Sequence, residues 1–513
     1  MSRPHDLTSA AVAVVAGVAV AFVTRVALAR LNPNDDLIHS PVTELRGVMG
    51  FFLGHVPEFF GVLGAKAQGD AMLRHFAETR AAGKQACTVQ ILSEKWLVPL
   101  NPRDIEYILL KRDGKYIKPA IYDRAAILTG SMGLVVIRDE VAHSRHRRAL
   151  NPAFSVASLR ETYDDIVVKR VVRLVDELTV VLSEDGRVNQ PVVCDLEHAF
   201  DSLSIDITAE AAFRQTNVGE LNVSQQFATM LAAFSRAQYL LIRGGSWLPT
   251  KDVQICQRAQ NCVRKAAAIM FQRARASAAA PDVGSRQGRK LLVDYLAEAG
   301  LDASSVEDHC LTMLLAGHET TSVTLQWTTY LLATHQDWQQ QLFEEVNAAV
   351  HETGVPSLET VRGLTLLRNV IRESMRLFPA SSFLNRLSIE DDVLPHSGIF
   401  VPKGTEIAMY IFALHRDPAV WGADAHEFNP NRWLDTDRID NVVGPGGYLP
   451  FSLGKRNCIG KEFALNELLA TLAVFVRRFH VAWPDGQRHP VRRTRLALAP
   501  TEPIKLLVSC RQR

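Results

Sequence analysis

The sequence lacks an excess of charge of either sign. Its 57 lysines and arginines are nearly balanced by 55 aspartates and glutamates, which leaves a formal net charge of +2. Proteins that bind nucleic acids through the phosphate backbone carry a clustered basic excess that neutralises the phosphates. The balance therefore argues against a nucleic-acid-binding protein, and we expect no nucleic acid among the partners.

Cysteine is scarce and irregularly placed. The 513 residues include seven cysteines, which is an odd number, and their spacing follows no pattern. Disulfide frameworks of small secreted domains use an even number of closely spaced cysteines. The pattern therefore excludes a disulfide scaffold and indicates reduced thiols in a cytosolic environment. The cysteines are Cys87, Cys194, Cys256, Cys262, Cys310, Cys458 and Cys510.

The sequence also lacks the glycine fingerprint G-x-G-x-x-G with which α/β domains bind dinucleotide phosphates. The segment 444–447 reads GPGG, which is typical of a turn rather than of a phosphate-binding loop. No internal repeat and no composition break divides the chain. We therefore expect no dinucleotide site in this chain, although its 47% hydrophobic residues suffice for a large core.

One stretch near the N-terminus departs from a soluble composition. Residues 7–24 read LTSAAVAVVAGVAVAFVT without a charge, close to the roughly 18 residues at which a transmembrane helix becomes a candidate. Arg25 and Arg30 follow, which by the positive-inside rule keeps the downstream chain cytoplasmic. A cleaved signal peptide is the alternative, because small residues precede a cleavage-like site. We predict a single-pass anchor at 1–30 in front of one domain at 31–513.

Helical periodicity dominates the rest of the chain, so we predict a mainly α fold with small β-sheets. Two β-branched runs, 87–92 and 95–99, are typical of strands in a small sheet. The segment 394–411, with glycines and a proline between apolar pairs, predicts a hairpin. The predicted long helices are 159–182, 227–241, 253–279, 306–335 and 336–352.

The most informative segment is 451–460, which reads FSLGKRNCIG. Gly454 and Gly460 bracket Cys458 and let the backbone approach a flat cofactor closely. A helical pattern follows directly, so Cys458 is expected near a helix N-terminus, whose dipole favours an anionic thiolate. Turn amides can also donate hydrogen bonds to the sulfur of a metal-bound thiolate. A buried structural cysteine is the alternative, but burial alone explains neither the glycines nor Arg456.

These residues fit the pattern F-x-x-G-x-R-x-C-x-G, and here the sequence resembles the cytochrome P450 family. The resemblance implies the cytochrome P450 fold, with a single catalytic domain that binds haem b (iron protoporphyrin IX). It implies that Cys458 is the metal ligand on the haem iron, and that Phe451 and Gly460 belong to the cofactor-binding residues. The resemblance extends from Gly54 to the C-terminus and is sharp at four motifs.

A second motif lies in the fourth predicted helix, where residues 316–321 read AGHETT. The oxygen-activation pattern of the family is A-G-x-[DE]-T-[TS], so the resemblance implies catalytic roles for Glu319 and Thr320. Ala316 and Gly317 are small and are expected to leave room over a haem face. The Thr320 hydroxyl is expected to bond to a backbone carbonyl one turn earlier and to loosen the helix. A carboxylate beside a hydroxyl can then relay protons from solvent.

Another interpretation of this helix stays open. An acidic residue on a solvated helix face, with threonines packed beside it, would give the same local sequence. His318 stands at the variable position of the motif. We expect its side chain to turn away from the iron.

Two further motifs predict a buried ion-pair network. Glu373 and Arg376 stand three residues apart on one predicted helix, and residues 428–433 read FNPNRW. The second segment fits the family pattern F-x-P-x-R-[FW], so the resemblance implies a network of Glu373, Arg376 and Arg432 that is structural rather than catalytic. A solvated surface ion pair is the alternative.

Haem propionates need cations, and the resemblance implies arginines for that role. Arg456 lies inside the cysteine motif, Arg386 lies seven residues after Pro379, and Arg147 lies further upstream. A planar guanidinium can bind a carboxylate through two hydrogen bonds. The position four before Arg147 is often tryptophan in the family and is His143 here. An imidazole can still donate a hydrogen bond to a propionate.

Together these motifs predict a microsomal-type haem-thiolate monooxygenase that inserts one oxygen atom from dioxygen into a lipophilic small molecule. Electrons would come from NADPH through a separate NADPH-cytochrome P450 reductase, with cytochrome b5 as a further candidate donor. A basic proximal face could dock such an acidic donor, or it could be a solvated charge cluster. The residues of that face are Arg145, Arg148, Lys455 and Lys461.

The same resemblance implies a place in the endoplasmic reticulum membrane, with the catalytic domain in the cytoplasm. The layout and His143 resemble fungal members, in which secondary-metabolite oxidation is common. Two other functions stay open: a reductase-independent haem-thiolate isomerase or dehydratase, and a non-catalytic membrane haem-binding protein. Isomerase chemistry has no use for a proton relay, so Glu319 together with Thr320 argues against the first. The expected pocket segments are largely aliphatic and do not name a substrate.

Overall fold

The computed structural model leaves the predicted anchor at 1–30 outside the described residues. Among the described residues, no helix is both long and apolar enough to cross a bilayer. The described residues are 38–39, 70–91, 94–112, 114–183, 190–215, 221, 223–242, 250–279, 290–350, 356–494 and 496–511.

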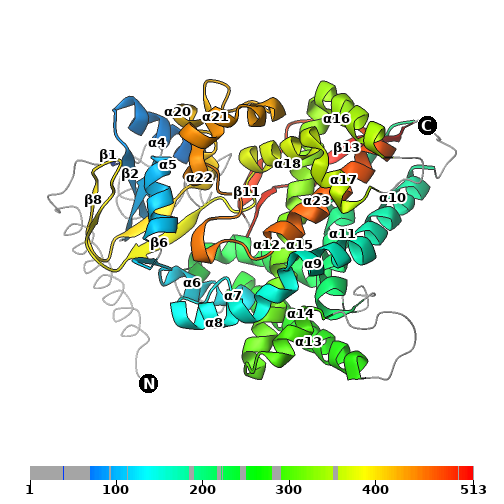
Figure 1. The fold of residues 1–513 in the computed structure, drawn as a ribbon, viewed down its shortest axis with the longest axis horizontal. Helices are drawn as coiled ribbons and strands as arrows, with labels where there is room; N and C mark the ends of the chain where they lie inside the picture. Colours follow the sequence, from blue (N-terminus) through cyan, green and yellow to red (C-terminus); the bar gives the residue numbers. More distant parts are fainter. Residues whose placement is uncertain are drawn as a thin grey trace, which may run out of the picture.

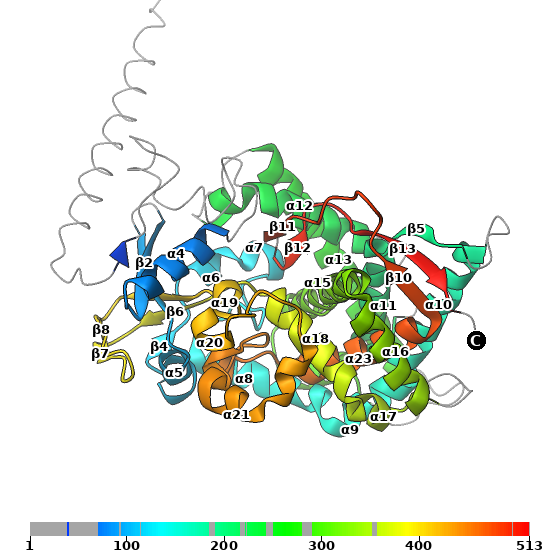
Figure 2. The same cartoon turned by 90° about the horizontal axis from the view of Figure 1, so that it is seen from above.

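Helices make up most of the described chain. The long helices gather on one side of the molecule and the largest sheet lies at the other (Figure 1). In Figure 2, α15 runs through the helical side, where it packs against α11, α13, α18 and α23. The helices are α4 (Asp70–Ala81), α5 (Pro102–Glu106), α6 (Ile121–Arg124), α7 (Ala126–Thr129), α8 (Glu140–Leu150), α9 (Val156–Thr162), α10 (Val168–Ser183), α11 (Glu197–Phe213), α12 (Val223–Ile242), α13 (Lys251–Ala279), α14 (Leu292–Glu298), α15 (Ala303–Thr334), α16 (Gln336–Ala349), α17 (Leu358–Gly363), α18 (Thr365–Leu377), α19 (Ile411–Leu414), α20 (Pro418–Trp421), α21 (Thr436–Arg438), α22 (Gly444–Gly447) and α23 (Lys461–Arg478).

The long helices confirm the periodic segments, with one correction. The segment 159–182 is not one regular helix, because a π-helical turn, η3 (Tyr163–Val167), separates α9 from α10. A π-turn adds a residue to the turn and so rotates the following side chains. Tyr163, Ile166 and Val167 are all buried. Hydrophobic periodicity alone does not reveal such an insertion.

The strands form small sheets, as predicted. In the described chain the largest sheet has the order β1-β2-β3-β9-β6-β4, and three smaller sheets accompany it. The predicted hairpin at 394–411 is shifted and smaller, because β8 pairs with β7, which ends just before this segment, and β9 joins the large sheet between β3 and β6. The strands are β1 (Ile38–His39), β2 (Ala86–Ile91), β3 (Glu94–Pro99), β4 (Tyr116–Ile117), β5 (Val192–Asp195), β6 (Leu384–Ser388), β7 (Asp392–Val393), β8 (Phe400–Val401), β9 (Glu406–Met409), β10 (Phe479–Ala482), β11 (Arg492–Thr494), β12 (Leu498–Pro500) and β13 (Lys505–Cys510).

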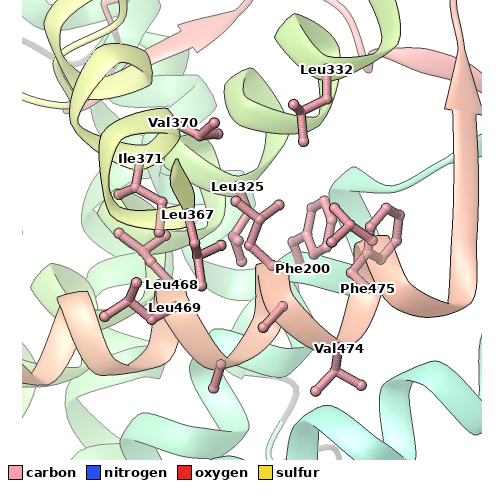
Figure 3. Close-up of a cluster of buried hydrophobic side chains, with 14 of the residues drawn as sticks. Phe200, Leu325, Leu332, Leu367, Val370, Ile371, Leu468, Leu469, Val474 and Phe475 are labelled. Carbon is pink, nitrogen blue, oxygen red and sulfur yellow. The ribbon is translucent and has the colours of Figure 1, made fainter. Parts of the chain in front are cut away.

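The main hydrophobic core joins α11, α15, α18 and α23. Phe200, Leu325, Leu367, Leu468 and Phe475 come from these helices and point toward one another (Figure 3). Each such side chain contributes roughly 1.5–3 kcal/mol when it is fully buried. The core therefore fixes α23, whose first turn follows Cys458, against α15.

The predicted network of Glu373, Arg376 and Arg432 is present and buried. Arg376 donates to both Glu373 oxygens, at 2.8 and 2.7 Å, and Arg432 donates to one of them at 3.1 Å. Trp433 Nε1 and the Asn429 backbone N–H also donate to this carboxylate, at 3.1 and 3.0 Å. The prediction of a structural network is confirmed, and the surface ion-pair alternative is wrong.

Candidate active site

The loop that carries Cys458 ends at α23. The Cys458 N–H donates to the Phe451 carbonyl at 2.9 Å, which closes the loop, and α23 begins one residue after Gly460. Gly454 has φ +72°, a left-handed conformation that favours glycine. The structure therefore confirms the expected position of Cys458, in a turn between two glycines and beside a helix N-terminus.

The thiol of Cys458 is accessible, yet protein atoms surround it. The residue is exposed, yet burial is the largest influence on its pKa and raises it. The Gly460 backbone N–H and the charges of Arg147 and Lys461 act in the opposite direction. The thiol is thus accessible and at the same time desolvated by the protein atoms around it. A Cβ on Gly460 would lie only 4.0 Å from its sulfur and 3.8 Å from Phe154.

Two arginines tie this loop to α8 and the segment before it. Arg147 donates to the carbonyl and to the side-chain oxygen of Asn457, both at 2.6 Å. Arg456 donates to the Ile137 carbonyl at 2.6 Å and to Glu140 at 2.7 Å. Of the three arginines predicted to bind the cofactor, Arg147 thus contacts Asn457, the residue before Cys458. Arg456 contacts residues at the start of α8.

A buried excess of positive charge lies at the same place. Lys118 is buried, and its pKa is lowered well below the ordinary value, first by burial and then by the charges of Arg456 and Arg386. Burial, Arg456 and Lys118 likewise lower the pKa of buried His143 to about 3, so its imidazole is neutral. Glu140 is the acid that acts on Lys118 in the opposite direction. Such a cluster is stabilised when an anionic group enters it.

On α15, one short face is accessible within a buried helix. Ala316, Gly317 and Thr320 are partly exposed, whereas the flanking residues 308–315 and 321–329 are all buried. Positions i, i+1 and i+4 share one face of a helix. This accessible face, which we call the α15 groove, therefore interrupts the buried stretch 308–329 of the helix.

The hydroxyl of Thr320 makes the predicted local bond. It donates to the Ala316 carbonyl at 2.8 Å. The expected loosening does not appear as a break, because α15 is continuous from Ala303 to Thr334. Glu319, next to Thr320, is buried. It therefore does not lie on a solvated helix face.

Gly317 and His318 serve contacts with neighbouring helices. A Cβ on Gly317 would lie 2.6 Å from the Thr208 hydroxyl of α11, so its missing side chain permits close helix packing. The glycine therefore has a packing role besides the expected one of leaving room over a haem face, which stays a prediction. His318 stacks on Phe227 of α12, with ring centroids 5.9 Å apart, and its Nε2 lies 3.8 Å from Asp201 of α11.

Comparison with known proteins decides the family. The Cytochrome P450 family profile matches residues 54–508, which is most of the chain. The chain belongs to the cytochrome P450 family. Cytochrome P450 709B1 of Arabidopsis thaliana is 30% identical over 397 residues, 76% of this chain and 75% of the relative.

Two other relatives carry names that state an activity. A cytokinin hydroxylase of Arabidopsis thaliana is 40% identical over 189 residues, 37% of this chain and 36% of the relative. The echinocystic acid 23-monooxygenase of Saponaria officinalis is 27% identical over 378 residues, 71% of this chain and 70% of the relative. The chain is thus an oxidoreductase, a P450 monooxygenase of the haem-thiolate class. These relatives are plant proteins, and the expected likeness to fungal members finds no support in them.

The residues present fit the haem that the P450 family implies. An enclosed thiol suits the iron, and the buried cations suit two propionate carboxylates. The accessible face of α15 carries the small residues Ala316 and Gly317, which would not obstruct a bound cofactor. Arg386, on β6, is buried and acts on the same charge cluster.

Lys118 is the residue of this P450 that sequence reasoning missed. It lies just after β4, outside all four motifs, and its neighbours come from segments far apart in sequence. It donates to the Val135 carbonyl and lies 4.8 Å from the centre of the Tyr122 ring. A lysine followed by a proline is too common a signal to single it out, so only the folded cluster reveals it.

Proposed function

We propose that this P450 hydroxylates a lipophilic small molecule with electrons that originate from NADPH and arrive through a separate reductase. The overall reaction consumes the substrate, dioxygen, two electrons and two protons, and it yields the hydroxylated product and water. The observation that carries the proposal is the enclosed Cys458 thiol beside the buried cation cluster. The chain lacks a dinucleotide fingerprint, which supports a separate electron source.

Five residues would hold the cofactor at its charged edge, and Cys458 would hold its iron. Bound haem would supply the activation of dioxygen. Because Lys118 and Arg386 are buried, these two cations need little further desolvation when a carboxylate arrives, which favours tight binding. The neutral imidazole of His143 can donate one hydrogen bond without adding charge. The residues proposed for the propionates are Lys118, His143, Arg147, Arg386 and Arg456.

Glu319 and Thr320 are proposed to deliver protons at the α15 groove. The Thr320 hydroxyl donates to the Ala316 carbonyl. Its oxygen can still accept a hydrogen bond from a donor in the groove. Buried Glu319 lies next to it in sequence and can hold a proton close to the site. Their roles are to place and pass protons rather than to bind the substrate.

The finer assignments follow from the class of protein. We propose one catalytic domain at 31–513 behind an anchor at 1–30, in the membrane of the endoplasmic reticulum with the domain in the cytoplasm. NADPH-cytochrome P450 reductase, and cytochrome b5 as a second donor, would dock at the basic proximal face, whose four cations are all exposed. A role in the oxidation of secondary metabolites is part of the same proposal.

The test is oxygen incorporation. The full chain, reconstituted in lipid vesicles with NADPH-cytochrome P450 reductase, is incubated with a panel of lipophilic compounds under ¹⁸O₂. The proposal predicts a product that carries one ¹⁸O atom and forms only with NADPH and reductase. Turnover without NADPH would instead support an isomerase or dehydratase, and the proposed function would be wrong.

A further inference from the structure

The interface between α11 and α15 contains polar side chains that the proposed chemistry does not yet use. From α11 come Asp201 and Thr208, and from α15 come His318, Ser322 and Gln326. Apart from Asp201, these side chains are buried. Interfaces between buried helices are normally apolar, so a continuous polar seam at this place needs an explanation.

Contacts place these residues in order along the seam. Ser322 donates to Asp201 Oδ1, and Gln326 donates to the Ser322 hydroxyl at 3.1 Å. His318 Nε2 lies 3.8 Å from the same Asp201 oxygen. About two turns further along α11, Thr208 faces Gly317, because a Cβ on that glycine would lie 2.6 Å from the Thr208 hydroxyl. The seam thus runs from Asp201 past His318 to Thr208.

Several polar atoms in the seam lack a protein partner among the described residues. Both ring nitrogens of His318 and the hydroxyl of Thr208 are buried without a hydrogen bond. Leaving such a group unpaired costs about 1–3 kcal/mol. Buried polar groups of this kind are usually satisfied by ordered water. Two neighbouring side chains with the same need indicate a hydrated seam.

The two ends of the seam differ in what they reach. The Asp201 side chain is 22% exposed, so the outer end is in contact with solvent. At the inner end, Thr208 touches Gly317, which belongs to the partly exposed α15 groove. The seam thus has one end at solvent and the other end beside Gly317 of the α15 groove.

We propose that the Asp201–His318–Thr208 seam is a proton route from solvent to the α15 groove. This inference rests on the proposed function, because it supplies the two protons that the reaction consumes. A proton from solvent passes from the Asp201 carboxyl, directly or through one water, to His318. The imidazole takes up one proton at Nε2 and releases another at Nδ1, which leaves the proton on the other ring nitrogen. A flip of the ring, or proton transfer in the reverse sense between the two nitrogens through water, restores the starting tautomer. His318 is thus a positioning residue that acts through water and Thr208.

The electrostatics of His318 suit a transient carrier. Burial lowers its pKa, so the ring is neutral at rest, whereas the negative charge of Asp201 raises it. From α12 the ring meets Phe227, which is uncharged. Among the described residues, the negative charge of Asp201 is therefore what favours brief protonation of His318.

The first test compares two ways to drive turnover. His318→Phe keeps an aromatic ring against Phe227 and removes both nitrogens. Hydrogen peroxide brings the oxygen atom together with two protons and two electrons, so peroxide-driven hydroxylation does not need the route. With the best compound from the ¹⁸O₂ panel, we expect His318→Phe to form about tenfold less product per NADPH. This loss is smaller than the roughly 10²- to 10⁴-fold contribution of a catalytic acid or base, because His318 acts through water and Thr208. Peroxide-driven turnover should stay within about twofold of the wild-type rate.

Matched variants separate proton transfer from packing. Asp201→Asn keeps an acceptor for Ser322 and removes the charge, and Thr208→Val keeps the shape and removes the hydroxyl. Both should reproduce the effect of His318→Phe. Phe227→Leu removes the stacking partner but no polar atom, so it should leave product per NADPH unchanged. If Phe227→Leu and His318→Phe lowered NADPH-driven and peroxide-driven turnover alike, the residue would serve packing and the proton route would be wrong.

A readout without turnover completes the test. In ¹⁵N-histidine-labelled, haem-loaded protein, the ring N–H of His318 is identified by its loss in His318→Phe, and its exchange with D₂O is timed. A hydrated route predicts exchange within minutes in the wild type and clearly slower exchange in Asp201→Asn. Retention of the proton for hours in the wild type would overturn the inference. Failure of the wild type to hydroxylate any compound would count against the proposed function, but this exchange would still test the seam.

Discussion

The Glu373 carboxylate is the point at which the structure predicts the largest effect of a minimal substitution. Glu373→Gln replaces one carboxylate oxygen with an amide NH₂ group and nearly preserves the volume of the side chain. The carboxylate is fully buried and accepts five hydrogen bonds, from Arg376 (two), Arg432, Trp433 and the Asn429 backbone. After the substitution, two buried guanidinium groups lose their shared anion, and the new amide N–H₂ faces other donors.

The magnitude follows from this geometry. Removal of one partner from a buried, hydrogen-bonded ion pair costs about 3–5 kcal/mol, because the remaining charge stays buried. Glutamine keeps one acceptor oxygen, so we expect a loss near 3 kcal/mol in the free energy of unfolding, which is roughly 100-fold in the folded-to-unfolded ratio. The assay is urea unfolding of the full protein followed by far-ultraviolet circular dichroism.

A surface pair provides the control. Glu177 and Arg173 form an i,i+4 pair at 2.7 Å on α10, with side chains 60% and 68% exposed. Glu177→Gln makes the same chemical change in water and should cost less than about 0.5 kcal/mol. If Glu373→Gln cost no more than Glu177→Gln, the buried network would not stabilise this fold, and the argument from burial would be refuted.

Three further predictions concern the pocket, a turn and pH. Thr320→Val should keep the haem-thiolate spectrum but release peroxide at the expense of product, measured as product per NADPH; unchanged coupling would contradict its proton role. Gly130→Ala should lower the unfolding midpoint, because the glycine has φ +75° and a Cβ would lie 1.9 Å from Asp308 Oδ1, whereas Gly114→Ala, with nothing within 4 Å, should not. Burial raises the pKa of Glu467 to about 8, so the folded state holds a proton that the unfolded state loses above its ordinary pKa of 4.5. Stability should therefore fall by at most about 1.4 kcal/mol per pH unit between these values, and Glu467→Gln should remove this slope in urea unfolding measured from pH 5 to 8.5.

Local motifs predicted the parts of the site that are local in sequence. The cysteine loop and the Thr320 bond to the preceding turn each depend on residues within a short segment, and the Glu373 network joins two such motifs about 59 residues apart. The cation cluster could be foreseen only in part, because Lys118 contributes through burial among residues from distant segments. The sequence carries no periodic signal for that proximity.

Two elements show why helical patterns mislead about detail. The π-turn at Tyr163–Val167 preserves the apolar face, so the period alone cannot reveal the added residue. The sequence predicted that Gly317 leaves room over a haem face, and it did not predict that the missing side chain also lets α11 pack close to α15. Both outcomes depend on the partner helix, which a single sequence does not specify.

The central claim is that the enclosed Cys458 thiolate binds haem iron. The carbon monoxide difference spectrum of the reduced, detergent-solubilised protein, recorded beside Cys458→Ser, tests it most directly. We predict a strongly red-shifted Soret band in the wild type, and its loss in the variant. A folded, haem-loaded wild type without that band, or a variant that keeps it, would show that Cys458 is not the iron ligand.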